Sequence, residues 1–297
     1  MTVSSSALAV NASAPSFCAE QADGWQASLQ LQLKHKGVRT VLQSSVHHGP
    51  LRVQRPFYPE GGVCHLYLLH PPGGMVAGDN LTIGLDCQSA SQTLVTTPAA
   101  GKLYRVAAQA SPQYQGVSAK LAAGAELEWL PQETILFNGA RGELRNRFDL
   151  AADSRLLGWD IVCLGRRASG ECFDSGQVKQ RIEIYREGRP LLIDRVNFRG
   201  GSDMLNAPWG MAQQPVSGTL FATINTGVAI SAEALRAVLP AVDTNQQWGL
   251  SERNGILLVR YLGNSAEVCR RGFERIWQQL RPTLMIRPML RPRIWNT

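Results

Sequence analysis

The sequence predicts a mainly β fold, in which many strands form a stacked or helical β-sheet body and about two α-helices lie near the C-terminus. Three observations indicate this class. The chain alternates apolar and polar residues near its start, short apolar segments bounded by Gly, Asn, Asp or Pro recur along it, and helical periodicity begins only at Ser231. With 297 residues, of which 44% are hydrophobic, the chain can bury a sizeable core.

The first strand has the clearest pattern. In GWQASLQLQLK, which begins at Gly24, apolar and polar residues alternate strictly, so we expect a half-buried strand with one face in water. A turn at Lys36 and Gly37 leads to VRTVLQSSV, residues 38–46, which we expect to be its hairpin partner. Further segments that fit strands are 63–70, 81–87, 92–97, 126–130, 155–163, 178–186, 191–198, 218–225 and 256–262.

Two helices are expected in the last part of the chain. Ser231 fits the N-cap of SAEALRAVLPAV, and Pro240 limits the length of this helix. Ser265 fits the N-cap of SAEVCRRGFERIWQQLRP, whose apolar residues follow a helical period. Because proline cannot continue a helix without loss, Pro282 is expected just beyond the end of this second helix.

Composition separates residues 1–23, which are rich in Ser and Ala and expected to be flexible, from residues 24–297, which are expected to form one β-rich domain. The formal charge is +7, but the Lys and Arg residues are scattered and no aromatic residues alternate with them, so a nucleic-acid groove is not expected. No apolar run approaches the ~20 residues of a membrane span. Six cysteines without a C-x-x-C pair, and an N-terminus without a signal peptide pattern, indicate reduced thiols in a cytoplasmic protein.

The sequence lacks the local motifs of common enzymes, among them G-x-S-x-G, H-E-x-x-H, the Walker A loop and G-x-G-x-x-G. All five histidines lie between positions 35 and 70. His47 and His48 point to opposite faces of a regular strand, as do His65 and His70, so surface or hydrogen-bonded histidines are expected rather than a zinc site. HPPGG, which starts at His70, is followed by no helix start or Lys-Ser/Thr and is expected to be a structural turn, not a phosphate loop.

Acidic residues in apolar surroundings are the strongest candidates for a functional site. In RLLGWDIVCLG both faces of the strand are apolar, which places Asp160 in the interior, and PLLIDRVNF repeats the arrangement around Asp194. A buried carboxylate is costly unless it is paired, hydrogen-bonded, metal-bound or hydrated. Two interpretations stay open: an ion pair with an arginine such as Arg195 or Arg105, or a polar passage that Asp160 and Asp194 line and that Asp79 approaches.

Two segments are candidates for contact with a partner. Phe57 and Tyr58 stand between prolines in RPFYPEGG, where their rings are hard to bury in a regular strand and suit an interface. The C-terminal segment RPTLMIRPMLRPRIWNT has three Arg-Pro pairs and includes Arg291 and Trp295, so we expect an extended chain that packs on a partner or on the body. For RPFYPEGG too, a loop that folds back on its own domain is an equal alternative to contact with a partner.

Taken together, these segments resemble the UreD family of urease accessory proteins, which is called UreH in some organisms. The resemblance is carried by GWQASLQLQL, GPLRVQRPFYPEGGVCHLYLLHPPGGMVAGDNL, TTPAAGKLYR, LEWLPQETILFNGA, LLGWDIVCLGR and LRPRIW, in order from about Trp25 to Trp295. QRPFYPE, HPPGG and GD are its most distinctive parts.

The resemblance implies a non-enzymatic chaperone that helps to load nickel into apo-urease. It implies docking on apo-urease and on UreF, which holds the GTPase UreG, and a tunnel through which nickel(II) passes transiently, with no stably bound cofactor. The acidic positions of the family fall on Asp79, Asp160 and Asp194, the last of which is often Glu in the family. Because Ni²⁺ binds tightly to several histidines or thiolates, isolated carboxylates with water suit an ion that must be released.

Two other functional classes are alternatives. A hydrolase or transferase on a β scaffold would use Asp160 and Asp194 as an acid–base pair, but the sequence has no nucleophile or oxyanion motif. A β-rich nucleic-acid binder has only the net charge in its favour.

Overall fold

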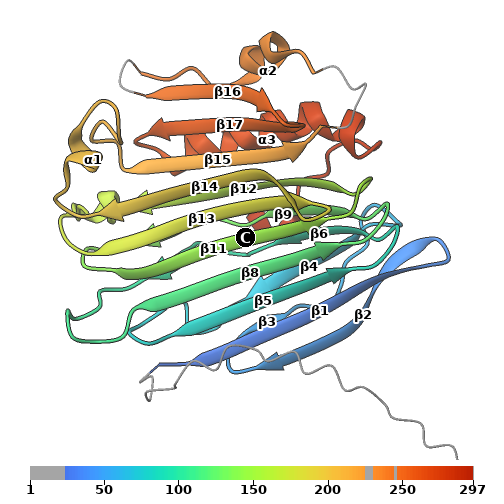
Figure 1. Cartoon of the computed structure of the whole chain (residues 1–297), viewed down its shortest axis with the longest axis horizontal. Coiled ribbons are helices and arrows are strands. Elements are labelled where there is room, and N and C mark those ends of the chain that lie inside the picture. The colour runs from blue at the N-terminus through green and yellow to red at the C-terminus, as the bar shows by residue number, and fades with distance from the viewer. Residues whose placement is uncertain (1–23, 225–229, 244–245, 297) are drawn as a thin grey trace, which may run out of the picture.

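The computed structural model describes residues 24–224, 230–243 and 246–296, which form two packed β-sheets (Figure 1). The segment 1–23, expected to be flexible, lies outside the described residues. The first sheet has the order β14 (Arg189–Arg199), β13 (Gln177–Arg186), β11 (Arg141–Leu150), β8 (Gln113–Leu121), β5 (Asn80–Cys87), β1 (Gln26–Lys36) and β2 (Arg39–His48). The second has the order β16 (Gln247–Arg253), β17 (Ile256–Gly263), β15 (Val216–Thr223), β12 (Arg155–Leu164), β9 (Glu126–Leu130), β6 (Gln92–Thr96), β4 (Cys64–Leu69) and β3 (Arg52–Val53). In addition, β10 (Thr134–Leu136) pairs with β12, and β7 (Gly101–Leu103) pairs with β10.

The middle of the chain winds as a coil, because successive long strands alternate between the two sheets. Strands β5, β8, β11 and β13 are parallel neighbours in the first sheet, and β4, β6, β9 and β12 are parallel neighbours in the second. Parallel strands need a long crossover connection, and here each crossover contains a strand of the opposite sheet. The expected mainly β, stacked body is confirmed.

The expected N-terminal hairpin is also confirmed. Strands β1 and β2 are antiparallel, with Lys36 opposite Arg39. Between them Gly37 has φ 61°, a left-handed conformation that glycine adopts without steric cost. Alternate residues of β1 are buried, as the period of two predicts.

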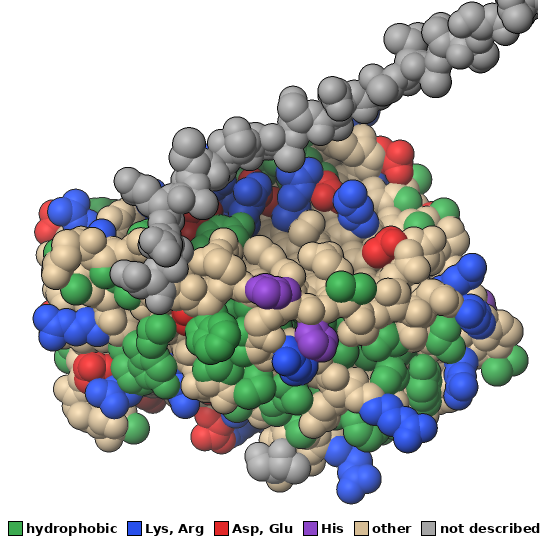
Figure 2. Space-filling model, turned by 90° about the horizontal axis from the view of Figure 1, so that it is seen from below, with side chains coloured by type: hydrophobic (Ala, Val, Ile, Leu, Met, Phe, Trp, Pro, Cys, Tyr) green, Lys and Arg blue, Asp and Glu red, His purple; other side chains and the backbone are tan. Residues whose placement is uncertain are grey.

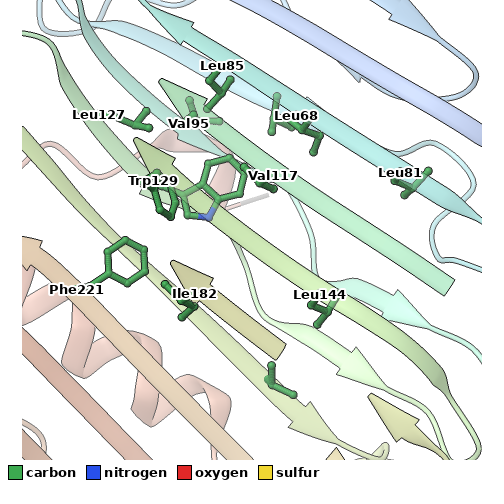
Figure 3. Packing of buried hydrophobic residues seen from close by; sticks show 14 of the residues in the cluster. Leu68, Leu81, Leu85, Val95, Val117, Leu127, Trp129, Leu144, Ile182 and Phe221 are labelled. Atoms are coloured by element: carbon green, nitrogen blue, oxygen red, sulfur yellow. The ribbon is translucent and has the colours of Figure 1, made fainter. Parts of the chain in front are cut away.

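The main core lies between the sheets (Figure 3). Alternate side chains of each sheet point into this layer, so residues of both sheets interdigitate. Figure 3 labels Leu81, Leu85, Val117, Leu144 and Ile182 from the first sheet and Leu68, Val95, Leu127, Trp129 and Phe221 from the second.

A second core lies on the other face of the second sheet, where helix α3 (Ala266–Leu284) packs across β12, β15 and β17. Because this sheet is covered on both faces, Leu157, Trp159 and Ile161 are as fully buried as their neighbours on β12. The double-sided burial expected for RLLGWDIVCLG is therefore confirmed.

Both expected helices are present, together with the short helix α1 (Asp203–Asn206). In α2 (Ala232–Val238) the Ser231 hydroxyl accepts a hydrogen bond from the Ala234 N–H, and in α3 the Ser265 hydroxyl accepts one from the Val268 N–H. The expectation that α3 ends before Pro282 is wrong, because the helix continues to Leu284. Pro282 lies in the last turn, where its missing N–H costs a single backbone hydrogen bond.

Candidate functional site

A cavity of about 200 Å³ lies between the two sheets. Residues of both sheets line it, because it interrupts the apolar layer that packs them together. Its walls are apolar except for a few polar side chains, which makes it a small, partly polar chamber. The polar and titratable side chains of the lining are His70, Thr97, Lys102, Gln115, Trp129, Gln132, Thr134 and Asp160.

Asp160 is the only predicted acidic residue among those that line this cavity. It lies on β12 and is 6% exposed. Its Oδ2 accepts a hydrogen bond of 2.9 Å from Nδ2 of Asn146, which projects from β11 in the opposite sheet. Burial raises the pKa of Asp160 to about 6, although a hydrogen bond from Gln180 opposes the rise, and the nearby charge of Asp194 adds to it. At neutral pH the carboxylate is ionised and weakly compensated.

His70 lines the same cavity from the end of β4. Its Nε2 is buried and forms no hydrogen bond with any residue that the structure describes. Burial lowers the pKa of His70, although the negative charge of Asp79 opposes this, so the ring is neutral at neutral pH. The expectation of a hydrogen bond is therefore not met at this nitrogen by the described residues, although His70 as a whole is partly exposed.

Asp79 has a different surrounding. It is 1% exposed, and its two oxygens accept hydrogen bonds from the backbone N–H groups of Trp25 at 2.7 Å and Val76 at 2.8 Å. These bonds join the start of β1 to the turn before β5. Asp79 is not among the residues that line the cavity, so its visible role is to hold this turn.

Asp194 lies on β14, at the edge of the first sheet. Its side chain is 16% exposed, and its Oδ2 lies 2.9 Å from Nη1 of Arg260 on β17. The expectation of an interior position is therefore wrong for Asp194, because its strand has a neighbour on one side only. An ion pair with an arginine is present, but the partner is Arg260 rather than Arg195 or Arg105.

The predicted contact residues of the RPFYPEGG loop are partly exposed. Phe57 is 47% exposed and stacks on Tyr67 with ring centroids 5.1 Å apart. Tyr58 is half-buried beneath the guanidinium of Arg39, 4.8 Å from its ring centroid, and burial raises the pKa of its hydroxyl. A contact with a partner stays a prediction for both residues.

The predicted contact residues of the C-terminal segment pack on the chain itself. Trp295 donates a hydrogen bond of 2.8 Å to the Thr96 hydroxyl, and its ring lies 5.8 Å from that of Trp159. Arg291 pairs with Glu274 of α3 at 2.9 Å. The segment thus covers part of the second core, and its contact with another protein stays a prediction.

A buried group of charges near this segment was not predicted from the sequence. Arg281 of α3 is 0% exposed and donates hydrogen bonds of 2.8 and 2.9 Å to Glu128 of β9 and of 2.8 Å to Glu60. Glu60 also lies 2.6 Å from Nε2 of His65. We call Arg281, Glu60, Glu128 and His65 the buried charge cluster.

The buried charge cluster joins three distant parts of the chain. Glu60 belongs to the RPFYPEGG loop, and although burial alone would raise its pKa, hydrogen bonds from His65 and Arg281 lower it to about 2. At Arg281, burial lowers the pKa of the guanidinium, whereas the carboxylates of Glu60 and Glu128 raise it. The net result is a raised pKa. The sequence does contain a signal of a buried arginine, because Arg281 falls on the apolar face of α3 one turn after Trp277.

Within the described residues, no three His, Cys, Asp or Glu side chains come together as a metal site. The five cysteines among them form no disulfide. None of the described helices combines the length and the apolar character needed to cross a membrane. Asp160 and Asp194 do not share the cavity, so the geometry gives no support to an acid–base pair that acts on one substrate.

Comparison with known proteins agrees with the sequence motifs. A family model described as UreD urease accessory protein matches residues 26–296. A urease accessory protein UreD of Saccharophagus degradans is 48% identical over 275 residues, which cover 92% of this chain and 93% of the relative. The UreD proteins of Dechloromonas aromatica and Klebsiella aerogenes are 46% and 43% identical and cover 94% and 92% of this chain, with 96% and 97% of their own lengths matched.

Proposed function

The chain belongs to the UreD family of urease accessory proteins, and from this premise we propose that it is a nickel-insertion chaperone. In this proposal it has no catalytic activity of its own and works in the cytoplasm. It docks on apo-urease and links it to UreF and, through UreF, to the GTPase UreG. Nickel(II) is its cargo, held transiently inside the chain on the way to urease.

The observation that supports a nickel path is the ionised carboxylate of Asp160 in a chamber between the sheets. One of its oxygens accepts a hydrogen bond from Asn146, and His70 is among the other residues that line the same cavity. A carboxylate oxygen and one imidazole nitrogen are both ligands that Ni²⁺ accepts, and water can complete its coordination. Two protein ligands form a weak site, which is what an ion in transit requires.

The surroundings of Asp160 favour exchange over storage. Because burial raises its pKa to about 6, protons compete with the metal ion only at mildly acidic pH. Asp194 adds negative potential from the edge of the first sheet, where Arg260 partly neutralises it. Asp79 contributes by fixing the turn that precedes β5 and by facing His70 with its charge.

Docking is proposed for the surface formed by the RPFYPEGG loop and the C-terminal segment. Phe57 offers the more exposed ring, whereas Trp295 and Arg291 are engaged with the chain's own residues. We therefore assign direct contact to Phe57 and Tyr58, and we assign to Arg291 and Trp295 the shaping of the same surface.

Asp160→Asn tests the path while keeping the shape of the side chain. Urease matured with this variant at limiting nickel should take up the metal on the order of tenfold more slowly, because one charged ligand is lost. Nickel in purified urease is measured by mass spectrometry, and co-purification with UreF serves to show that the complex still forms. Asp149→Asn, on the outward face of β11, is the matched control, since it removes a carboxylate that lies outside the cavity. Equal nickel contents for both variants and the unaltered chain would show that Asp160 is structural.

A further inference from the structure

No element among the described residues covers the outward face of the first sheet, whereas helix α3 covers the outward face of the second. Figure 1 is viewed onto the first sheet, and none of the described helices crosses it. Its outward residues are mostly polar or charged, with Val46 and Ile193 as exposed apolar exceptions, so the face is not an uncovered apolar layer. It also lies on the opposite side of the sheet from the cavity, so its chemistry is independent of a nickel path through the chain.

Three arginines stand side by side across this face. In the register of the sheet, Arg145 of β11 is the neighbour of Arg181 of β13, and Arg181 is directly opposite Arg195 of β14. Like charges at such positions repel each other and weaken strand pairing. We call Arg145, Arg181 and Arg195 the arginine row.

The charges of the row are only partly neutralised. Arg145 donates two hydrogen bonds, of 2.7 and 2.9 Å, to one oxygen of Glu183. Neither Arg181 nor Arg195 lies within ion-pair distance of a carboxylate among the residues that the structure describes. Two adjacent guanidinium groups therefore lack a counter-charge from the part of the chain that the structure describes.

A hollow of about 810 Å³ continues the row toward β5 and β1. Its charged lining consists of Lys120, Arg145 and Arg147 together with one carboxylate, Asp86, and Gly116 forms part of its floor. A Cβ atom at Gly116 would lie 2.7 Å from the hydroxyl oxygen of Tyr114, so glycine lets the tyrosine lie flat along the sheet. Figure 2 shows Lys and Arg side chains, with Asp and Glu side chains among them, along the upper rim of the molecule, the side that faces the viewer in Figure 1.

We propose that the arginine row and this hollow bind an acidic, Asp- or Glu-rich segment of a partner protein. Guanidinium groups form paired hydrogen bonds with carboxylates, and those of Arg181 and Arg195 are available for them. A carboxylate between these two arginines would also remove their mutual repulsion. The hollow gives the rest of an extended segment a place along the sheet.

A nucleic acid fits the same face less well. Glu183 and Asp149 lie beside the arginines and would repel a continuous phosphate backbone. The ring of Tyr185 is covered by the guanidinium of Arg147, 4.4 Å from its centroid, so it offers no free surface for base stacking. Spaced carboxylates of a polypeptide can avoid these negative positions.

The test compares two double variants with the same change in net charge. Arg181→Glu with Arg195→Glu reverses the row, and Arg236→Glu with Arg253→Glu reverses two exposed arginines of α2 and β16. The probe is a fluorescein-labelled polyglutamate peptide of about ten residues, followed by anisotropy at low salt. We expect the row variant to weaken binding by about tenfold or more and the control to stay within about twofold. Matching thermal unfolding of both variants checks the fold, and Arg→Gln at the same positions replaces any variant that does not fold.

A second measurement locates the peptide. The photo-crosslinker benzoylphenylalanine at Ser118, an exposed residue of the hollow, should capture the peptide, whereas the same group at exposed Ser251 of β16 should not. Equal losses in the two double variants, or no binding to the unaltered chain, would overturn the proposal. Tighter binding of an oligothymidine that is lost in the row variant would also overturn it, in favour of a nucleic-acid surface.

Discussion

Replacing Asp160 by Asn should stabilise the protein, by an amount that depends on pH. Burial raises the pKa of this carboxyl from 3.8 to about 6. At roughly 1.4 kcal/mol per pKa unit, ionised Asp160 lowers the free energy of unfolding by about 3 kcal/mol. Asn keeps an oxygen that can accept the hydrogen bond from Asn146, but it has no charge to bury.

The direction of this pH dependence follows from the difference in proton affinity of Asp160 between the folded and the unfolded chain. The folded chain keeps the proton of Asp160 to higher pH than the unfolded chain, so this residue's contribution to stability falls as pH rises from about 4 to about 6 and stays low above that. The full destabilisation by ionised Asp160 applies at about pH 8, and roughly half of it applies at about pH 5. The advantage of Asp160→Asn should therefore shrink by about 1.4 kcal/mol between about pH 8 and about pH 5.

The assay is equilibrium unfolding in urea, followed by tryptophan fluorescence, at both pH values. Asp174→Asn, which removes an exposed carboxylate that forms no ion pair with the described residues, corrects for the remaining effects of charge. A stability difference that does not change with pH, or a variant less stable than the unaltered chain at both values, would refute the view that Asp160 is ionised in a poorly solvated site.

Two further predictions concern the end of the chain. Arg281→Leu leaves Glu60 and Glu128 buried without their cation, so we expect the free energy of unfolding to fall by about 3–5 kcal/mol, measured by urea unfolding; a loss near zero would mean that water solvates the two carboxylates. Ile286 has φ 55°, which is strained for a β-branched residue, and its side chain is 77% exposed, so Ile286→Gly should stabilise the protein by about 1 kcal/mol. Thermal unfolding tests this, and a lower midpoint would show that the isoleucine side chain contributes packing.

The sequence predicted the kind of elements better than their arrangement. The alternation in β1 and the double-sided apolar pattern of β12 both gave correct burial. Strands β8 and β11 were missed, because β8 contains Gly116 and β11 carries charged residues outward and the polar Asn146 inward. The parallel order of the sheets could not be predicted, since strand spacing is the same whether the next strand lies in the same sheet or in the opposite one.

The candidate site was predicted in part. Asp160 was placed in the interior because its strand is apolar on both faces, and the structure places it there. Asp194 has the same local pattern but lies at a sheet edge, which local sequence does not reveal. His70 was expected to be an ordinary histidine, and only the packing of the two sheets brings it into the same cavity as Asp160.

The buried charge cluster has a consequence for how the protein is made. Glu60 and Arg281 are 221 positions apart, so during translation the glutamate leaves the ribosome long before its cation is synthesised. Contacts between such distant residues form late in folding. A prematurely terminated product that stops short of Arg281 lacks the cation that pairs with both Glu60 and Glu128, so we expect it to be less stable than the full chain.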